Sequence, residues 1–262
     1  MAALQNRARM GRGGGRVKVV GKLVLAGESF SLDDARAVIA GYCFGEETTE
    51  PDSPVSAYGE PLPAWRRARF GYRSYDCQRG PGEGIDIVDI VAPVLLNVTQ
   101  GYGVEIVSNL LAVAPVVNEV IQQVPADVAF WTPPREELEE SPEGSAAWLL
   151  HRAWYLIESV PGCGVTKTHK ILHHAWPRLF PLLDRQTMTR LGDNLWLAIY
   201  DDLTKPDQAP LFEDLEVWFA TLASTRDGVL LTRLRIYDIL LWCRVTGEEA
   251  EAARLSRDVL AD

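Results

Sequence analysis

The sequence lacks the features that membrane-spanning, exported and disulfide-rich proteins require. No apolar run reaches the roughly 20 residues that cross a bilayer, and residues 1–12 contain no apolar core of the signal-peptide type. The four cysteines lie far apart and form no CxxC pair, which argues against a disulfide framework, a zinc knot and a four-cysteine iron–sulfur cluster. We therefore expect a cytoplasmic protein with no membrane partner, bound metal or cofactor.

The charge balance is the next constraint on function. The chain has 262 residues, enough for one large domain or two small ones, and a net charge of −10. This charge opposes binding to a polyanion, because affinity for DNA depends on phosphate neutralisation. Residues 1–22 hold six basic and no acidic residues, which leaves 20 basic and 36 acidic residues, or −16, for the rest. This Gly/Arg-rich segment is either a nucleic-acid arm or a flexible tail.

Residue patterns predict a mainly α fold with a small N-terminal β element. Residues 17–25 are β-rich, and Ser31 with Asp34 resembles a capping box that opens a helix ending near Cys43. Proline, glycine and acidic residues predict loops at 45–64, 80–84 and 125–142. Apolar spacing predicts helices at 85–99, 104–123, 145–159, 168–176, 185–191, 194–203, 211–223, 231–245 and 248–260. We divide the chain into a tail at 1–22, an α+β portion at 23–84 and a helical domain at 85–262.

A glycine-rich connection joins two of these helices. The run VPGCGVTK at 160–167 places Gly162 and Gly164 before the second helix, where glycine permits positive φ and leaves backbone N–H groups uncovered. The dipole of that helix favours an anion at the same place. This pattern resembles the LPGVG hairpin with which helix-hairpin-helix DNA glycosylases hold a DNA phosphate, and it implies their helical fold.

A second segment strengthens the resemblance to these glycosylases. The run FPLLD at 180–184 is similar to the segment that carries their catalytic aspartate, and Asp184 lies 18 residues after Thr166, as the family pattern requires. The resemblance implies that Asp184 stabilises an oxocarbenium-like centre or activates water. Thr166 stands where bifunctional members have a Schiff-base lysine, which implies a monofunctional enzyme unless Lys167 reaches the site. The alternative is an interhelical turn, with Asp184 as the N-cap of the helix at Arg185.

Three longer runs resemble an actinobacterial family known only as domain of unknown function 6308. They are GIDIVDIVAPVLLNV at 84–98, GVTKTHKILHHAWPRLFPLLD at 164–184 and LLTRLRIYDILLWC at 230–243. The resemblance covers most of residues 70–245 and implies a fold but no established reaction. The chain departs from the family pattern at Trp176, where a basic residue is usual.

The candidate site residues fall into three groups. For catalysis we select Asp184 and Asp238, since Asp238 lies on an apolar helix and can face the same cavity. Its i,i+3 neighbour Arg235 makes a structural ion pair the alternative. The expected pocket residues are Tyr75, Trp176, Arg235 and Trp242. The expected nucleic-acid contacts are Gly162, Gly164, Val165, Thr166, Lys167, Lys170 and Arg185.

Two further clusters have both a structural and a functional interpretation. His169 and His173 have the i,i+4 spacing of metal ligands, but no HExxH motif accompanies them, so we expect solvated or core-edge histidines. Aromatic and arginine residues alternate over 65–76, the densest basic patch outside the tail. Such a composition either binds nucleic acid or covers a helical bundle.

These observations leave three functions open. The first is a DNA-associated protein resembling a monofunctional base-excision glycosylase, in which Asp184 assists hydrolysis of the N-glycosidic bond of a flipped base. The second is a catalytically silent derivative that only binds duplex DNA. The third is an enzyme acting on a small-molecule substrate in the same pocket, which the acidic net charge favours.

Overall fold

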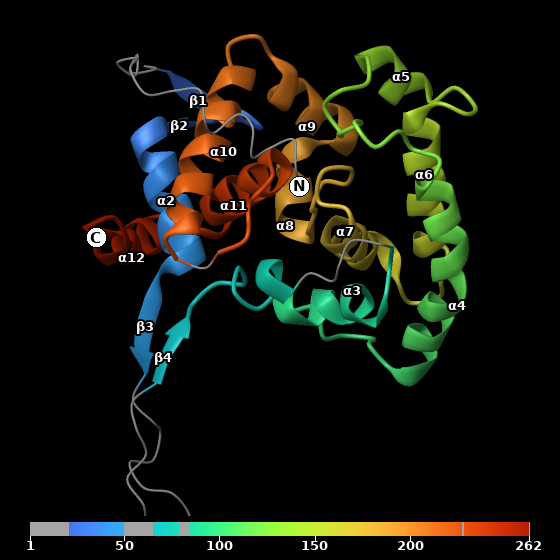
Figure 1. The fold of residues 1–262 in the computed structure, drawn as a ribbon, viewed down its shortest axis with the longest axis horizontal. Coiled ribbons are helices and arrows are strands. Elements are labelled where there is room, and N and C mark those ends of the chain that lie inside the picture. Colours follow the sequence, from blue (N-terminus) through green and yellow to red (C-terminus); the bar gives the residue numbers. More distant parts are fainter. Residues whose placement is uncertain (1–20, 50–64, 79–83, 227, 262) are drawn as a thin grey trace, which may run out of the picture.

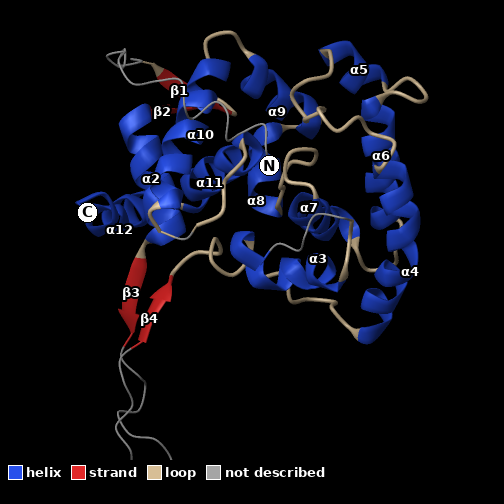
Figure 2. Cartoon of the chain, in the orientation of Figure 1, coloured by secondary structure: helices blue, strands red, loops and turns tan. Residues whose placement is uncertain are grey.

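The protein is mainly α-helical, as the sequence predicts, and its described residues include two small antiparallel sheets (Figure 1). The computed structural model describes residues 21–49, 65–78, 84–226 and 228–261. The strands are β1 (Lys22–Leu25), β2 (Glu28–Ser31), β3 (Glu46–Thr49) and β4 (Trp65–Ala68). The helices are α2 (Leu32–Phe44), η2 (Asp76–Gln78), α3 (Ile87–Val91), η3 (Ala92–Leu96), α4 (Val104–Ile121), α5 (Arg135–Glu140), α6 (Ala146–Glu158), α7 (Gly164–Ala175), α8 (Arg185–Leu191), α9 (Leu195–Thr204), α10 (Ala209–Ser224), α11 (Arg233–Thr246) and α12 (Glu249–Ala261). Figure 2 shows both sheets on the same side of the helical body.

The N-terminal hairpin follows from local sequence rules. β1 pairs with β2, and Ala26 and Gly27 form the two-residue turn with φ of 49° and 80°. Positive φ at both positions matches the turn type that suits the twist of a hairpin. Ser31 then caps α2, because its side chain accepts a hydrogen bond from the backbone N–H of Asp34, as the capping-box pattern predicts.

Two large hydrophobic cores and one small cluster, made of Tyr75, Ala92 and Leu182, lie within the described part of the body. The first joins the N-terminal hairpin and α2 to α8–α12, and the second joins α3, α4, α6 and α7. α2 and α12 pack closely because Gly41 has no side chain: a Cβ there would lie 1.7 Å from the backbone oxygen of Ala252. Trp196 of α9 packs against both cores. The described part of the predicted α+β portion therefore shares its core with the C-terminal helices.

The predicted helices from residue 185 onward agree with the structure to within about two residues. α7 begins at Gly164, four residues earlier than predicted and inside the glycine-rich motif, and this first residue has a positive φ of 63°. The predicted helix at 85–99 is replaced by α3 and η3, with a proline in the first turn of η3. α5 occupies part of the predicted loop at 125–142, and β3 pairs with β4 across the predicted loop at 45–64.

Two sequence predictions lie largely outside the described residues. The basic tail at 1–22 is described only at Gly21 and Lys22, and the loops at 45–64 and 80–84 only at their ends.

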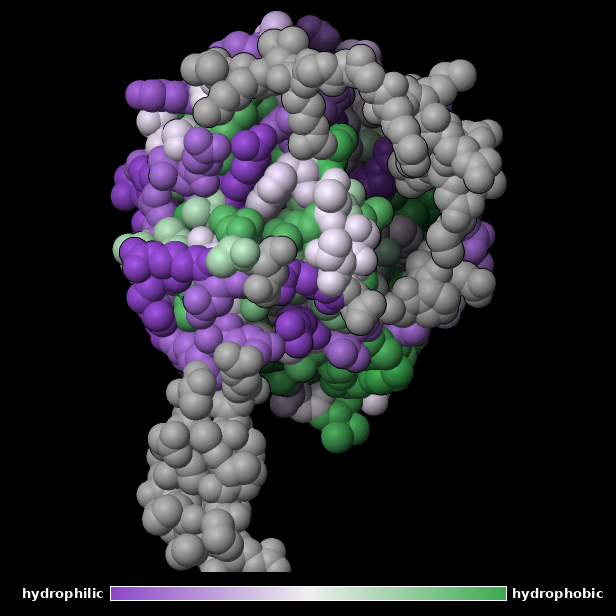
Figure 3. Space-filling view, turned by 60° about the vertical axis from the view of Figure 1, so that its left-hand side comes forward, coloured by the Kyte–Doolittle hydropathy of each residue, from purple (hydrophilic) through white to green (hydrophobic). Residues whose placement is uncertain are grey.

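α4 is the one helix within the described ranges whose length and composition would let it cross a membrane. A single such helix is weak support for a membrane span, because the core helix of a soluble protein meets the same criteria. Ile106, Leu110 and Val117 of α4 are buried in the second core. Figure 3 shows one face of the molecule, on which hydrophilic residues cover most of the left side and hydrophobic residues gather at the lower right.

Candidate functional site

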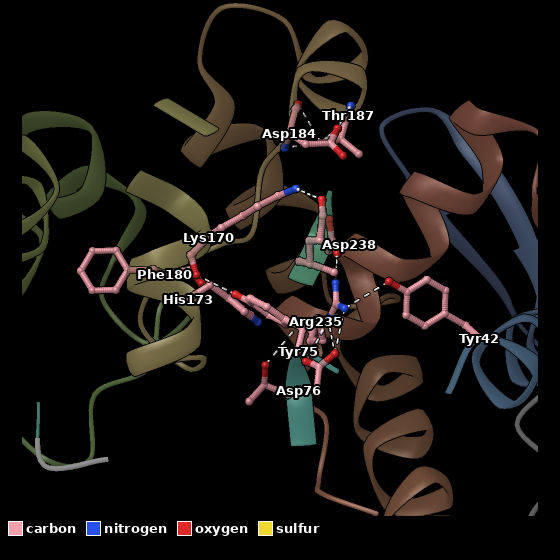
Figure 4. A network of polar contacts seen from close by, with 12 residues as sticks. Tyr42, Tyr75, Asp76, Lys170, His173, Phe180, Asp184, Thr187, Arg235 and Asp238 are labelled. Atoms are coloured by element: carbon pink, nitrogen blue, oxygen red, sulfur yellow. Dashed lines mark hydrogen bonds and ion pairs between the residues drawn. The ribbon is translucent and has the colours of Figure 1, made fainter. Parts of the chain in front are cut away.

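A cavity of about 100 Å³ lies between segments of the two cores. Its walls come from α2, residues 69–71, η3 with Asn97, α7, residues 182–184 and α11. A water needs roughly 10–15 Å³, so the cavity has room for several waters or one small planar group. Figure 4 shows Lys170, Asp184 and Asp238 converging from three different elements. The polar and aromatic side chains that line the cavity are those of Tyr42, Arg69, Phe70, Asn97, Lys170, Asp184, Arg235, Asp238 and Trp242.

Asp184 is held at the cavity wall by the start of α8. Its carboxylate accepts hydrogen bonds from the backbone N–H groups of Gln186 (2.8 Å) and Thr187 (3.0 Å). The backbone N–H of Asp184 in turn donates to the Thr187 hydroxyl at 3.2 Å, which completes a capping box. The predicted N-cap is therefore present, and the same side chain also lines the cavity.

Two histidines of α7 hold the segment that precedes α8. Nδ1 of His169 lies 3.0 Å from the carbonyl oxygen of Pro181, and Nδ1 of His173 lies 2.7 Å from that of Phe180. A carbonyl oxygen only accepts, so both Nδ1 atoms donate. Burial lowers the pKa of His169 to about 4, which leaves its ring neutral at neutral pH. The i,i+4 spacing thus attaches residues 180–181 to α7, and within the described ranges no three His, Cys, Asp or Glu side chains cluster as metal ligands.

Asp238 belongs to a buried network centred on Arg235 (Figure 4). Arg235 pairs with Asp238 one turn further along α11, and with Asp76 through Nε and Nη2 at 2.8–3.1 Å. Its Nη2 also donates to the Tyr42 hydroxyl at 3.2 Å. Oδ2 of Asp238 accepts from Arg235, whereas Oδ1 has no hydrogen-bond partner among the described residues. The ion pair between Arg235 and Asp238, which the sequence offered as the structural alternative, is therefore present. Oδ1 of Asp238 stays available for a hydrogen bond in the cavity.

The protonation of Asp238 differs from that of an ordinary aspartate. Burial raises the pKa of Asp238 from 3.8 to about 7; the charge of Arg235 opposes this rise, and the charge of Asp184 adds to it. A carboxyl group with this pKa exchanges its proton near neutral pH, which is the property of a general acid.

Lys170 reaches the cavity from α7 and is almost fully buried. Its Nζ donates to the carbonyl oxygen of Leu96 at 3.2 Å, and the structure gives it no ion pair within the described ranges. Burial lowers the pKa of Lys170, while the charges of Asp184 and Asp238 act in the opposite direction. The sequence groups Lys170 with the hairpin contacts to nucleic acid, but the structure places its amino group inside the cavity.

Aromatic rings form part of the cavity wall. Tyr42 and Phe70 stack with their centroids 4.9 Å apart, and Trp242 meets each of them edge-on at 6.1 Å. Such rings offer flat apolar faces to a planar ligand.

The four residues expected in the pocket take three different positions. Arg235 and Trp242 line the cavity. Tyr75 lies behind it, where its hydroxyl donates to the carbonyl oxygen of Lys170 at 2.7 Å. Trp176 lines a separate depression between the end of α4 and the end of α7.

The glycine-rich hairpin has the open backbone that the sequence predicts. Gly162 and Gly164 have φ of 83° and 63°, and a Cβ at Gly164 would meet nothing within 4 Å. In the described chain Cys163 gives α7 no side-chain cap, so the first N–H groups of α7 have no such partner. Lys167 folds back and donates to the carbonyl oxygen of Gly162 at 2.6 Å. The other expected contacts are half-buried or exposed: Val165, Thr166 and Arg185.

The arginine and aromatic residues at 69–76 cover the helical body. Arg69 pairs with Glu47 and Glu248, and Arg73 pairs with a glutamate of β3. Tyr72 is buried, and its hydroxyl donates to a backbone carbonyl at 2.6 Å. These contacts favour the structural interpretation of this cluster. The side chains of residues 65–68 lie outside the described part.

Sequence reasoning missed Asp76 and Tyr42, the partners of Arg235, as well as the Leu96 carbonyl. A signal for Asp76 was available, since an arginine in an apolar helix requires a buried acid. It also missed the buried pair in which His174 Nδ1 lies 2.6 Å from an oxygen of Asp89.

Comparison with known proteins gives one match. The model of a family described as Family of unknown function (DUF6308) matches residues 55–245, a range that contains every cavity-lining residue except Tyr42. No curated protein and no solved structure is significantly similar to the chain.

Proposed function

The chain belongs to the DUF6308 family, and we propose that its cavity hydrolyses the N-glycosidic bond of a nucleobase in DNA. On this proposal the protein is a cytoplasmic, monofunctional glycosylase-like hydrolase. One observation carries it: Asp184, at the start of α8, and Asp238, on α11, line the same cavity. The resemblance of the hairpin and of the FPLLD segment to helix-hairpin-helix glycosylases supports it.

The two carboxyl groups differ in environment, as an acid–base pair requires. Asp184 is half-buried and held by backbone amides, whereas Asp238 is buried with a pKa of about 7. Departure of a base leaves positive charge on the sugar and electrons on the base. The Asp184 carboxylate stabilises the sugar cation, orients the attacking water and accepts the proton that this water loses, and protonated Asp238 donates its proton to the departing base.

The cavity walls and the hairpin suit a nucleotide turned out of a duplex. Tyr42, Phe70 and Trp242 provide ring faces against which a base can stack. The uncapped start of α7 favours a phosphate. Gly164 and Lys170 lie on the same helix, separated by about 9 Å of helical rise, so one rigid element connects the phosphate position with the cavity.

The test is release of free base from duplex DNA carrying damaged or mismatched bases, followed by chromatography. Asparagine caps a helix about as well as aspartate, so Asp184→Asn removes the carboxylate and leaves α8 capped. Asp193→Asn makes the same change at an exposed position and serves as the control. We expect release by the wild type and the control, and a loss of about 10²–10⁴-fold in Asp184→Asn. Equal release by all three proteins would contradict the role of Asp184, and no release by the wild type would contradict hydrolysis.

A catalytically silent DNA-binding protein is distinguished by affinity. Fluorescence anisotropy with duplex DNA that contains an abasic-site analogue measures binding at low and high salt. Several phosphate contacts weaken binding on the order of a hundredfold between about 50 and 200 mM salt. Salt-sensitive binding that Asp184→Asn leaves unchanged, without base release, would support binding alone.

A small-molecule N-glycoside is the second candidate substrate. The net charge of −10 disfavours a polyanion, and the two lysines near the hairpin are occupied: Lys167 by the Gly162 carbonyl, Lys170 inside the cavity. On this alternative the protein shows no DNA affinity and releases base from free nucleosides at a rate that salt does not change.

A further inference from the structure

Lysine is scarce in this chain, and one lysine lines the cavity. The sequence contains five lysines beside 21 arginines. Lys205 lies at the surface beside Asp202, and Lys167 lies at the hairpin. Lys170 alone among the described lysines is buried, and its amino group points from α7 toward the gap between Asp184 and Asp238 (Figure 4). The hydrolysis proposed above assigns no step to this amine.

We propose that Lys170 is an amine nucleophile that condenses with the aldehyde or keto group of a small substrate in this cavity to form an imine. A buried lysine is normally paired with an acid, but the structure gives Lys170 one hydrogen bond, to the neutral carbonyl oxygen of Leu96. This activity uses the cavity of the proposed function and does not depend on hydrolysis of an N-glycosidic bond.

The surroundings of Lys170 favour the reactive form of the amine. Burial lowers its pKa, and the neutral amine is the nucleophile in imine formation. Asp184 and Asp238 oppose this lowering, and the positive charge of Arg235 adds to it. The backbone of Lys170 is fixed by α7 and by the hydroxyl of Tyr75, which donates to its carbonyl oxygen. The amine therefore projects from a rigid position.

The neighbouring carboxyl groups complete the proton transfers. The lone pair of Nζ attacks the carbonyl carbon, and one of the two amine protons passes to the carbonyl oxygen, which becomes the hydroxyl of a carbinolamine. Protonated Asp238 donates its proton to this hydroxyl, which leaves as water, while the nitrogen forms a double bond to carbon. Asp184 accepts the second amine proton from the nitrogen, which leaves a neutral imine. One water is released for each imine, and no oxidant or reductant takes part.

The size and lining of the cavity restrict the substrate class. A volume of about 100 Å³ admits a carbonyl compound of a few carbons or an opened sugar. The rings of Phe70 and Trp242 line the cavity and would contact the apolar part of such a substrate. Asn97 and the two aspartates line the same cavity and would form hydrogen bonds with the hydroxyl groups of the substrate.

The experiment traps the imine in the intact full-length protein. Glyceraldehyde is added at neutral pH with sodium cyanoborohydride, which reduces an imine to a stable secondary amine, and peptide mass spectrometry maps the adduct over the five lysines and the N-terminus. We expect most of the early adduct on Lys170 of the wild type. Adduct on Lys167 and Lys205 with none on Lys170 would overturn the proposal, and this result needs no variant.

Two variants sharpen the test. Lys170→Arg keeps a cation of similar length and should abolish the adduct at this position, while Lys205→Arg, the matched control at the surface, should leave labelling of Lys170 unchanged. Asp238→Asn should lower labelling of Lys170 but not of Lys167, and equal labelling of Lys170 would overturn the assigned proton transfer. Base release is read out separately by chromatography, so failure of hydrolysis and failure of imine formation are told apart.

Discussion

The buried carboxyl group of Asp238 should make the protein less stable as the pH rises. Burial raises its pKa from 3.8 to about 7 in the folded protein. In the unfolded chain the group ionises near its usual pKa. Between about pH 4 and pH 7 the unfolded state has therefore lost a proton that the folded state keeps. Folded-state stability is highest below this interval, declines through it, and stays lower above pH 7.

The magnitude follows from the difference between the two pKa values. At about 1.4 kcal/mol per pKa unit, this difference corresponds to about 4 kcal/mol of unfolding free energy. Other groups also titrate, so the informative quantity is the difference between Asp238→Asn and the wild type. The asparagine has the same shape and does not titrate. The substitution also removes the ion-pair partner of Arg235, which lowers stability by an amount that does not depend on pH. This loss cancels when the difference between the two proteins is compared at two pH values.

Urea denaturation followed by tryptophan fluorescence measures this difference, since the chain has eight tryptophans. We expect the free energy of unfolding of Asp238→Asn, relative to the wild type, to rise by up to about 4 kcal/mol from pH 4 to pH 8. Asp193→Asn, at an exposed position, should show no comparable trend. A difference between Asp238→Asn and the wild type that stays constant over this range would refute the assignment.

Two further substitutions test the packing around the site. Arg235→Met removes the buried ion pair between Arg235 and the Asp76 carboxylate and should cost about 3–5 kcal/mol in urea denaturation. Arg254→Met, which breaks an exposed ion pair, should cost less than about 1 kcal/mol, and equal costs would contradict the assigned burial. Gly41→Ala should lower stability by about 1–3 kcal/mol or more, because its Cβ would overlap the α12 backbone. Gly103→Ala meets no atom within 4 Å, so a thermal melt should show the larger loss only for Gly41→Ala.

Features that depend on a few consecutive residues can be predicted from the sequence. The starts of α2 and α8 are marked by Ser31 and Asp184, whose side chains accept hydrogen bonds from residues two or three positions later. The open hairpin is predictable for the same reason, since Gly162 and Gly164 take positive φ within one short run. The Arg235–Asp238 pair follows from their spacing on one helix.

Features that join distant segments could not be obtained in this way. The position of the Lys170 amine and the partner of Arg235 depend on how distant segments pack against one another. Arg235 and Asp76 are 159 positions apart, and helical periodicity relates only neighbours on one helix.

Local spacing and residue type are enough to predict the helical class, the capped helix starts and the glycine hairpin. The choice of Asp184 rests on the resemblance to the glycosylases, and the catalytic roles of Asp184 and Asp238 stay predictions. The packing of distant segments adds three facts that local patterns do not contain: both aspartates line one cavity, the Lys170 amine points between them, and one oxygen of Asp238 has no hydrogen-bond partner in the described part of the chain. The physical reason is burial: the exclusion of water that shifts the pKa values of Asp238 and Lys170 arises when remote segments close around them.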